Sequence, residues 1–290
     1  MPSTPSRRSL LASAGTVLAG FAGCSGGDSG TEGSPDRTTT ATPGTGTPSR
    51  TVDAPPVDWD GVAPFRTWLT DHTTLPSSNY RFDYQRTGLE DLLGTGRVSV
   101  FDLSAAEVSG FLTQSGNAIY LGSFDGDALA EALASSSDHE RTGSHAGYAT
   151  ATSADGVTEF AVGDDAVLAG SDLDAWIDAH RGERPRLEEV YPVFTLLLSR
   201  LAARGIVTAQ LGPPTGSDLP GDAVYAWGNA MAAADADEAT WVYVTADSPT
   251  ESLVADIEAT LADSPLVAGV DDVTVEGRVV TLVGTPAAPE

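Results

Sequence analysis

Four histidines are the residues of this sequence best suited to acid–base or metal chemistry. His139 lies within the small-residue stretch 135–144, which we interpret as a turn, and His145 follows it directly; Asp138 and Glu140 are adjacent to His139. Imidazole and carboxylate groups are ligands for zinc and related metals, and a loop could bring both imidazoles to one ion. No third ligand stands at the spacing of a known zinc motif, so a solvated loop is the competing interpretation.

Signals for other chemistry are weaker. Residues 143–147 read Gly-Ser-His-Ala-Gly, which is not the Gly-X-Ser-X-Gly pattern, and neighbouring residues of a strand point to opposite faces. The chain contains no lysine, which excludes both a P-loop and a Schiff-base lysine. The sequence therefore predicts no catalytic residue and no cofactor.

Cys24 is the single cysteine of 290 residues, so an intrachain disulfide and a cysteine zinc site are both excluded. It follows paired arginines, Arg7 and Arg8, and an uncharged run over 10–21. That run is too short for a bilayer span, which takes about 20 apolar residues. The order of basic pair, apolar run and small residues is typical of an export signal.

The residues at 6–11, Ser-Arg-Arg-Ser-Leu-Leu, resemble a twin-arginine signal, and Ala-Gly-Cys at 22–24 resembles a lipoprotein box. This resemblance implies recognition by the export machinery through Arg7 and Arg8, export of a folded chain, and cleavage before Cys24 with lipid attached to its sulfur. Phe21 departs from the usual leucine of the box, and an uncleaved apolar segment is the competing interpretation. We expect residues 1–23 to be a signal peptide and the lipid on Cys24 to hold the protein on the membrane.

Residues 24–56 are predicted to form a disordered tether. The segment consists mainly of Gly, Ser, Thr and Pro, and it has too few large apolar residues to offset the entropy of ordering. About 30 such residues reach roughly 30 Å. The globular part then begins near residue 57.

The chain carries 41 acidic residues against 15 basic ones, all arginine, for a net charge of -26. A surface of this kind repels itself in dilute buffer, whereas at 1 M salt the Debye length is about 3 Å. The acids are spread along the whole chain, so a saline solvent explains them better than a localised binding site. The composition resembles that of proteins from salt-loving archaea, and the lack of a basic patch argues against nucleic-acid binding.

Two stretches of the globular part look alike. The first runs from a strand at 118–124 through a helix at 127–135 to strands at 145–152, 159–162 and 166–169. The second runs from a strand at 240–245 through a helix at 249–262 to strands at 273–276 and 279–283. We interpret each as a β-α-β-β unit with a helix covering one face of an antiparallel sheet.

Helices are also expected at three places outside these units. Ser104 followed by Glu107 forms a capping box and predicts a helix over 105–114. A second helix is expected to begin near Asp174 and end at Gly182, and a third, opened by Pro192, is apolar around most of its circumference. The last two should join the units. The prediction is an α+β fold of two β-α-β-β units covered by helices, sharing a core through the central helices, with boundaries at 57–210 and 211–290.

The segment 104–208 resembles a group of secreted or lipid-anchored haloarchaeal proteins. The residues that carry this likeness are Gly-Ser-Phe-Asp at 122–125, Gly-Tyr at 147–148, Phe-Ala-Val at 160–162 and the helix at 174–182. The resemblance implies an exported protein and no particular activity.

Two hypotheses for function remain open. The first is a non-enzymatic lipoprotein on the extracellular face of the cell membrane of a halophilic archaeon, which binds a protein or small-molecule partner or organises the cell surface. The second is an extracellular metal-dependent hydrolase with His139 or His145 at its site. The lack of a nucleophile or metal motif favours the first.

Overall fold

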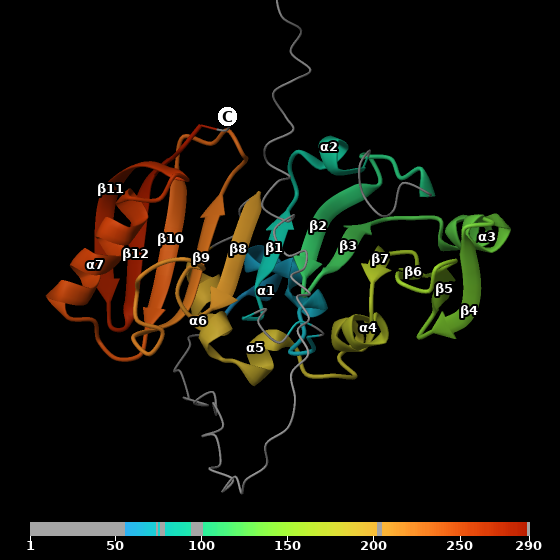
Figure 1. The fold of residues 1–290 in the computed structure, drawn as a ribbon, viewed down its shortest axis with the longest axis horizontal. Helices are drawn as coiled ribbons and strands as arrows, with labels where there is room; N and C mark the ends of the chain where they lie inside the picture. Colours follow the sequence, from blue (N-terminus) through green and yellow to red (C-terminus); the bar gives the residue numbers. More distant parts are fainter. Residues whose placement is uncertain (1–55, 74, 76–78, 94–100, 202–204, 289–290) are drawn as a thin grey trace, which may run out of the picture. The chain divides into compact units, whose positions relative to one another are not determined.

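A computed structural model describes residues 56–73, 75, 79–93, 101–201 and 205–288 (Figure 1). The helices are α1 (Trp59–Val62), the 3-10 helix η3 (Pro64–Trp68), α2 (Leu89–Leu93), α3 (Gly126–Ser135), α4 (Asp174–Arg181), α5 (Leu187–Val190), α6 (Val193–Arg200) and α7 (Glu251–Ala262). The strands are β1 (Phe82–Gln85), β2 (Val108–Gln114), β3 (Asn117–Gly122), β4 (His139–His145), β5 (Tyr148–Ser153), β6 (Glu159–Val162), β7 (Ala166–Gly170), β8 (Ile206–Leu211), β9 (Val224–Met231), β10 (Ala239–Thr245), β11 (Val267–Glu276) and β12 (Val279–Pro286).

The strands form one antiparallel sheet of 12 strands in the order β11-β12-β10-β9-β8-β1-β2-β3-β7-β6-β5-β4. Figure 1 shows β8 to β12 on one side of β1 and β2 to β7 on the other. The two halves meet where β1 pairs with β8, with Phe82 opposite Ala209 and Gln85 opposite Ile206. The backbone hydrogen bonds of the sheet therefore continue across its middle.

The predicted fold of two β-α-β-β units covered by helices is wrong. The pairing of β1 with β8 merges both halves into a single sheet, and the predicted boundary at residue 210 falls inside β8. Strands that the pattern did not identify, β2, β4 and β9, complete this sheet. Pairing between strands distant in sequence leaves no local signal, so the sequence pattern alone predicts two separate units.

The predicted helix over 105–114 is also wrong. Its capping box exists, since Ser104 N donates to Glu107 Oε2 at 3.0 Å and Ala106 N donates to Ser104 Oγ at 3.2 Å. The box closes only a turn, and the chain then enters β2, in which Val108, Gly110, Leu112 and Gln114 are buried alternately. The burial of this alternate set in the sheet outweighs the local helix signal.

Helices pack on both faces of the sheet. Neighbouring residues of β10 show this directly, because Val242 joins the cluster under α4, α5 and α6, whereas Trp241 joins a second cluster under α7. On β6, Ala161 belongs to the first cluster and Phe160 to a third one under α3. As predicted, the apolar residues of α6 are deeply buried: Val193, Phe194, Leu196, Leu197 and Leu198.

Candidate functional site

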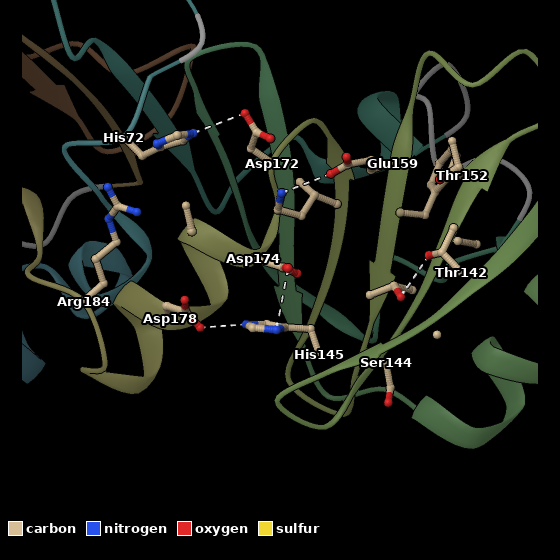
Figure 2. Close-up of a pocket in the computed structure, with 16 residues that line it drawn as sticks. His72, Thr142, Ser144, His145, Thr152, Glu159, Asp172, Asp174, Asp178 and Arg184 are labelled. Carbon is tan, nitrogen blue, oxygen red and sulfur yellow. Dashed lines mark hydrogen bonds and ion pairs between the residues drawn. The ribbon is translucent and has the colours of Figure 1, made fainter.

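A pocket of about 640 Å³ lies between α4 and the sheet strands β4, β5 and β6 (Figure 2). The helix is only eight residues long and ends at Gly182, which adopts a left-handed conformation with φ 74°. The polar residues of β4 and β5 are therefore left uncovered beside the helix. The volume falls within the range of about 300–1,000 Å³ that is usual for small-molecule sites.

Threonines form the floor of the pocket. Thr150 and Thr152 stand on β5, and between them Ala151 is buried, in the cluster on the opposite face of the sheet under α3. On β4 the register shifts between Arg141 and Gly143, which places Thr142 at a β-bulge. Its hydroxyl donates to Thr150 Oγ1 at 3.0 Å. The sheet thus presents a patch of hydroxyl groups to the pocket.

The wall facing this floor comes from α4, and His145 crosses to it. His145 Nε2 lies 2.7 Å from Asp178 Oδ1, and its Nδ1 lies 3.7 Å from Asp174 Oδ2. Asp174 and Asp178 are four residues apart, so they share one side of the helix. Because His145 is the last residue of β4, this contact ties the end of the β4–β5 hairpin to α4 (Figure 2).

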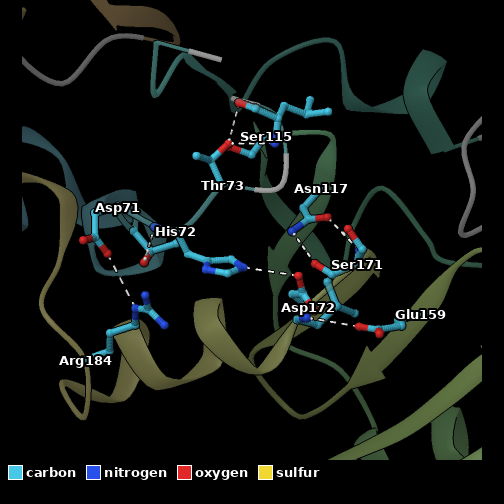
Figure 3. Close-up of polar contacts among 12 residues, drawn as sticks. Asp71, His72, Thr73, Ser115, Asn117, Glu159, Ser171, Asp172 and Arg184 are labelled. Carbon is cyan, nitrogen blue, oxygen red and sulfur yellow. Dashed lines mark hydrogen bonds and ion pairs between the residues drawn. The ribbon is translucent and has the colours of Figure 1, made fainter. Parts of the chain in front are cut away.

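The far side of the pocket holds a second set of polar contacts (Figure 3). His72 Nε2 lies 3.3 Å from Asp172 Oδ2, and Arg184 Nε lies 3.6 Å from Asp71 Oδ1. Glu159 on β6 accepts a hydrogen bond from the backbone N–H of Leu173 at 3.2 Å. Residues from the 71–73 segment, β6 and both ends of α4 therefore meet around one space.

Two buried amides position α4 against the sheet. Gln114, at the end of β2, accepts from Thr70 N at 3.1 Å and from Trp176 Nε1 at 3.2 Å, and it donates to Thr70 O at 2.9 Å. Asn117 on β3 donates to Ser171 O at 3.0 Å and accepts from Ser171 N at 2.8 Å. Trp176 is fully buried, so α4 is anchored through both packing and hydrogen bonds.

A second hollow of about 490 Å³ lies on the other side of the hairpin turn. There the hydroxyl of Tyr148 donates to Asp165 Oδ1, while His180 Nε2 lies 3.0 Å from Asp165 Oδ2. The His180 hydrogen bond, supported by that of Tyr148, holds the pKa of Asp165 below its usual range despite desolvation. Burial and the bond to Asp165 raise the pKa of Tyr148. Trp68 stacks on the His180 ring at 3.9 Å between centroids, which indicates a packed structural network.

The two histidines predicted as metal ligands lie at opposite ends of β4. His139 contacts Ser136 Oγ through Nδ1 at 2.9 Å and packs against Phe160, whereas His145 contacts Asp178. The predicted loop is a strand, and six residues at about 3.3 Å each separate the two by roughly 20 Å. Within the described ranges, no group of three or more His, Cys, Asp or Glu residues is arranged to hold a metal ion. This geometry does not support one ion shared by His139 and His145.

The remaining predicted site residues, Cys24, Arg7 and Arg8, lie outside the described residues, as does the predicted tether up to residue 55. Sequence reasoning missed most of the pocket. The spacing of Asp174 and Asp178 on a predicted helix was an available signal for one wall. The contact of His72 with Asp172 joins residues 100 positions apart, and no local sequence pattern predicts it. None of the helices in the described part of the chain is long and apolar enough to cross a membrane.

Comparison with known proteins gives little. No family model matches the chain, and no curated protein matches it. Among solved structures, crystal form I of TP0453 is similar at 11% identity, with a TM-score of 0.47, covering 79% of this chain and 94% of that one. Crystal form III of TP0453 is similar at 10% identity and a TM-score of 0.42, over 78% and 94% of the two chains. Likeness at this level carries no functional argument.

Proposed function

We propose that this chain is a lipid-anchored binding module on the extracellular face of a halophilic archaeal cell, and that it captures a small polar solute in the α4 pocket. The observation that carries the binding role is the pocket of about 640 Å³ onto which polar side chains converge from the segment at His72, from β4, β5 and β6, and from α4 with its flanking residues. Such convergence on a concave surface is typical of ligand sites.

The pairing of His145 favours binding over catalysis. A general base needs a ring nitrogen that can reach a proton on the substrate. In this pocket Nε2 of His145 contacts Asp178 at 2.7 Å, and Nδ1 faces Asp174 at 3.7 Å. Both nitrogens are directed at α4, so the imidazole serves to hold the hairpin against the helix.

The proposed location on the cell membrane rests on the sequence. Arg7, Arg8 and the uncharged run after them fit a twin-arginine signal, and Cys24 fits the lipidated residue of a lipoprotein box. Two acyl chains on one cysteine anchor a protein stably, because each buried methylene contributes about 0.8 kcal/mol. The net charge of -26 fits a protein that works in concentrated salt.

Cell fractionation in a haloarchaeal host tests the proposed location and the lipid anchor. We expect the wild-type protein in the membrane fraction and Cys24→Ser in the medium. A paired Arg7→Lys and Arg8→Lys variant should remain inside the cell. Retention of Cys24→Ser on the membrane would show that the lipid anchor is wrong, while leaving the binding role to be judged separately.

Filling the pocket tests the binding role. Thr150→Trp places a large side chain on the pocket floor, and Thr274→Trp makes the same change on the exposed face of β11 as a control. Each protein is dialysed in molar KCl against the concentrated small-molecule fraction of a haloarchaeal culture, and native mass spectrometry detects retained solutes. We expect retention by wild type and Thr274→Trp and none by Thr150→Trp. Equal retention by all three proteins, or none by wild type, contradicts the proposal.

A further inference from the structure

We propose that the α4 pocket recognises a neutral polyhydroxylated solute, that is, a sugar or a polyol. This inference rests on the binding role proposed above and names the chemistry of the ligand. It is drawn from the combination of donors and acceptors around the pocket.

The floor offers hydroxyl groups, which both donate and accept. Thr150 and Thr152 project from β5, and Thr142 is already bonded to Thr150 at 3.0 Å, which fixes the orientation of that pair. Threonine has a stiff χ1, so its hydroxyl is held in place at little further entropic cost. A rigid hydroxyl surface is complementary to a ligand that carries hydroxyl groups of its own.

The acidic wall offers acceptors. Asp178 uses Oδ1 for His145, Asp172 uses Oδ2 for His72, and Glu159 uses Oε2 for the Leu173 amide. Each of these carboxylates keeps a second oxygen that has no protein partner among the residues placed by the structure. A carboxylate can accept several hydrogen bonds, so neighbouring hydroxyls of a polyol can be bound together.

The pocket wall also contains a hydrogen-bond donor, Arg184, and this donor favours a polyol over an amine as the ligand. The ion pair of Arg184 with Asp71 uses Nε, so the terminal amino groups of the guanidinium remain as donors. An ammonium ligand only donates, and it would leave Arg184 and the threonine hydroxyl protons unmatched. An anion would match Arg184 but meet four carboxylates: Glu159, Asp172, Asp174 and Asp178. A hydroxyl group donates and accepts, and it suits both kinds of partner.

The solvent supports the same choice. At 1 M salt the Debye length is about 3 Å, so charge attraction contributes little until the groups are in contact. Hydrogen bonds between hydroxyls and carboxylates do not depend on long-range attraction. A neutral polyhydroxylated ligand can therefore be recognised in the salt that the acidic surface requires.

Calorimetric titration of the full-length protein in molar KCl and detergent tests the inference. The probes are glucose, galactose and mannose as neutral hexoses, glucosamine as the cationic analogue and gluconate as the anionic one. We expect at least one neutral hexose to bind and gluconate not to bind. Thr150→Val should weaken hexose binding about fivefold, which corresponds to the loss of one hydrogen bond. Thr274→Val on β11 should leave it unchanged.

Asp174→Asn distinguishes a neutral polyol from a cationic amine as the ligand. The amide of asparagine keeps an acceptor oxygen but loses the negative charge. Hexose binding should weaken by no more than the loss of one hydrogen bond allows, about fivefold, whereas recognition of a cation should weaken much further. Binding of glucosamine alone, abolished in Asp174→Asn, overturns the inference and leaves the pocket as a binding site. Failure of all five probes at tens of millimolar also overturns it, and retention of culture solutes by wild type but not by Thr150→Trp would then show that only the ligand class is wrong.

Discussion

The imidazole of His145 bridges two elements, with Nε2 placed 2.7 Å from Oδ1 of Asp178. His145 ends the edge strand β4, and Asp178 lies in α4 on the opposite side of the pocket. The hairpin is further held by Arg181, whose NH1 donates to Ala146 O at 3.2 Å. Contacts between α4 and the tip of the β4–β5 hairpin therefore hold these two sides of the pocket together.

A double-mutant cycle between His145 and Asp178 should reveal this coupling. Both side chains are 32% exposed, so we expect a coupling energy of at most about 1 kcal/mol. The loss of the contact should appear mainly as faster amide hydrogen exchange in β4 and β5, because an edge hairpin opens locally. Exchange in β10, in the other half of the sheet, should not change.

His139 supplies the control for that cycle. It lies at the other end of β4 and contacts Ser136, so His139→Ala paired with Asp178→Ala should give additive effects. A coupling energy as large as that of the His145–Asp178 pair would mean that both histidines of β4 act on Asp178 through long-range electrostatics. The hairpin would then not be held by a specific contact.

Gln114→Leu should destabilise the fold by about 2–4 kcal/mol. The substitution strips Thr70 N, Thr70 O and Trp176 Nε1 of their partner in a buried setting, and each unsatisfied group costs about 1–3 kcal/mol before relaxation. Chemical denaturation in constant salt measures the effect. Gln85→Leu is the matched control, because the Gln85 side chain has no hydrogen bond within the described residues; a similar cost for both variants would contradict the role of Gln114.

Several helices could be predicted from the sequence because their signals are local. The apolar residues around α6 predicted its burial, and the helix expected from Asp174 to Gly182 is α4, which Gly182 caps. The strand β4 could not be found in the same way. Its residues His-Glu-Arg-Thr-Gly-Ser-His are nearly all polar, since the edge of a sheet gains by carrying charges that discourage pairing with other chains.

The pairing of β1 with β8 is a second feature that the sequence does not predict. Tyr84 pairs with Val207 across the middle of the sheet, yet each strand taken alone fits a separate unit equally well. The pocket depends on other long-range contacts, because Gln114 on β2 and Asn117 on β3 bond Trp176 and Ser171 and so hold α4 in place. The sequence shows which residue types are present, but only the folded structure shows that these residues lie around one pocket.

The ion pair of Arg66 with Glu188 is buried, with side chains 15% and 5% exposed and a distance of 3.0 Å. Arg66→Met leaves Glu188 without its counter-charge and should cost about 3–5 kcal/mol at pH 7. Arg66→Met with Glu188→Met should recover most of this loss, because apolar replacement of both partners removes the desolvation penalty. Urea or guanidinium titrations measure both, and a double variant no more stable than the single one would contradict the account.

The cost of Arg66→Met should also depend on pH. Burial raises the pKa of Glu188, so the folded chain takes up a proton at a higher pH than the unfolded chain does. Stability from this group therefore increases as pH falls from the raised pKa towards about 4.3. We expect a smaller cost at pH 5 than at pH 7, and an equal cost at both would mean that Glu188 stays ionised.

Asp165 should show the opposite dependence. Its pKa is lowered, first by the hydrogen bond to His180, so it stabilises the fold above the usual pKa of about 3.9 and loses this effect as pH falls through the lowered value. Asp165→Asn should be less stable than wild type by at most about 1 kcal/mol near pH 6, because the side chain is 51% exposed. The difference should shrink as pH falls through the lowered pKa, and a difference that stays constant over the acid range would point to lost packing.

The salt requirement is the broadest prediction, and it follows from 41 acidic residues opposed by 15 arginines. On dialysis from molar KCl to dilute buffer the Debye length grows from about 3 Å to about 30 Å, so distant carboxylates begin to repel one another and the compact state loses free energy. Circular dichroism should report loss of structure in dilute buffer and its recovery when KCl is returned. Sucrose at matched osmolality stabilises by exclusion but does not screen charge, so it should restore much less. An unchanged spectrum in dilute buffer would show that the acidic surface is not an adaptation to salt.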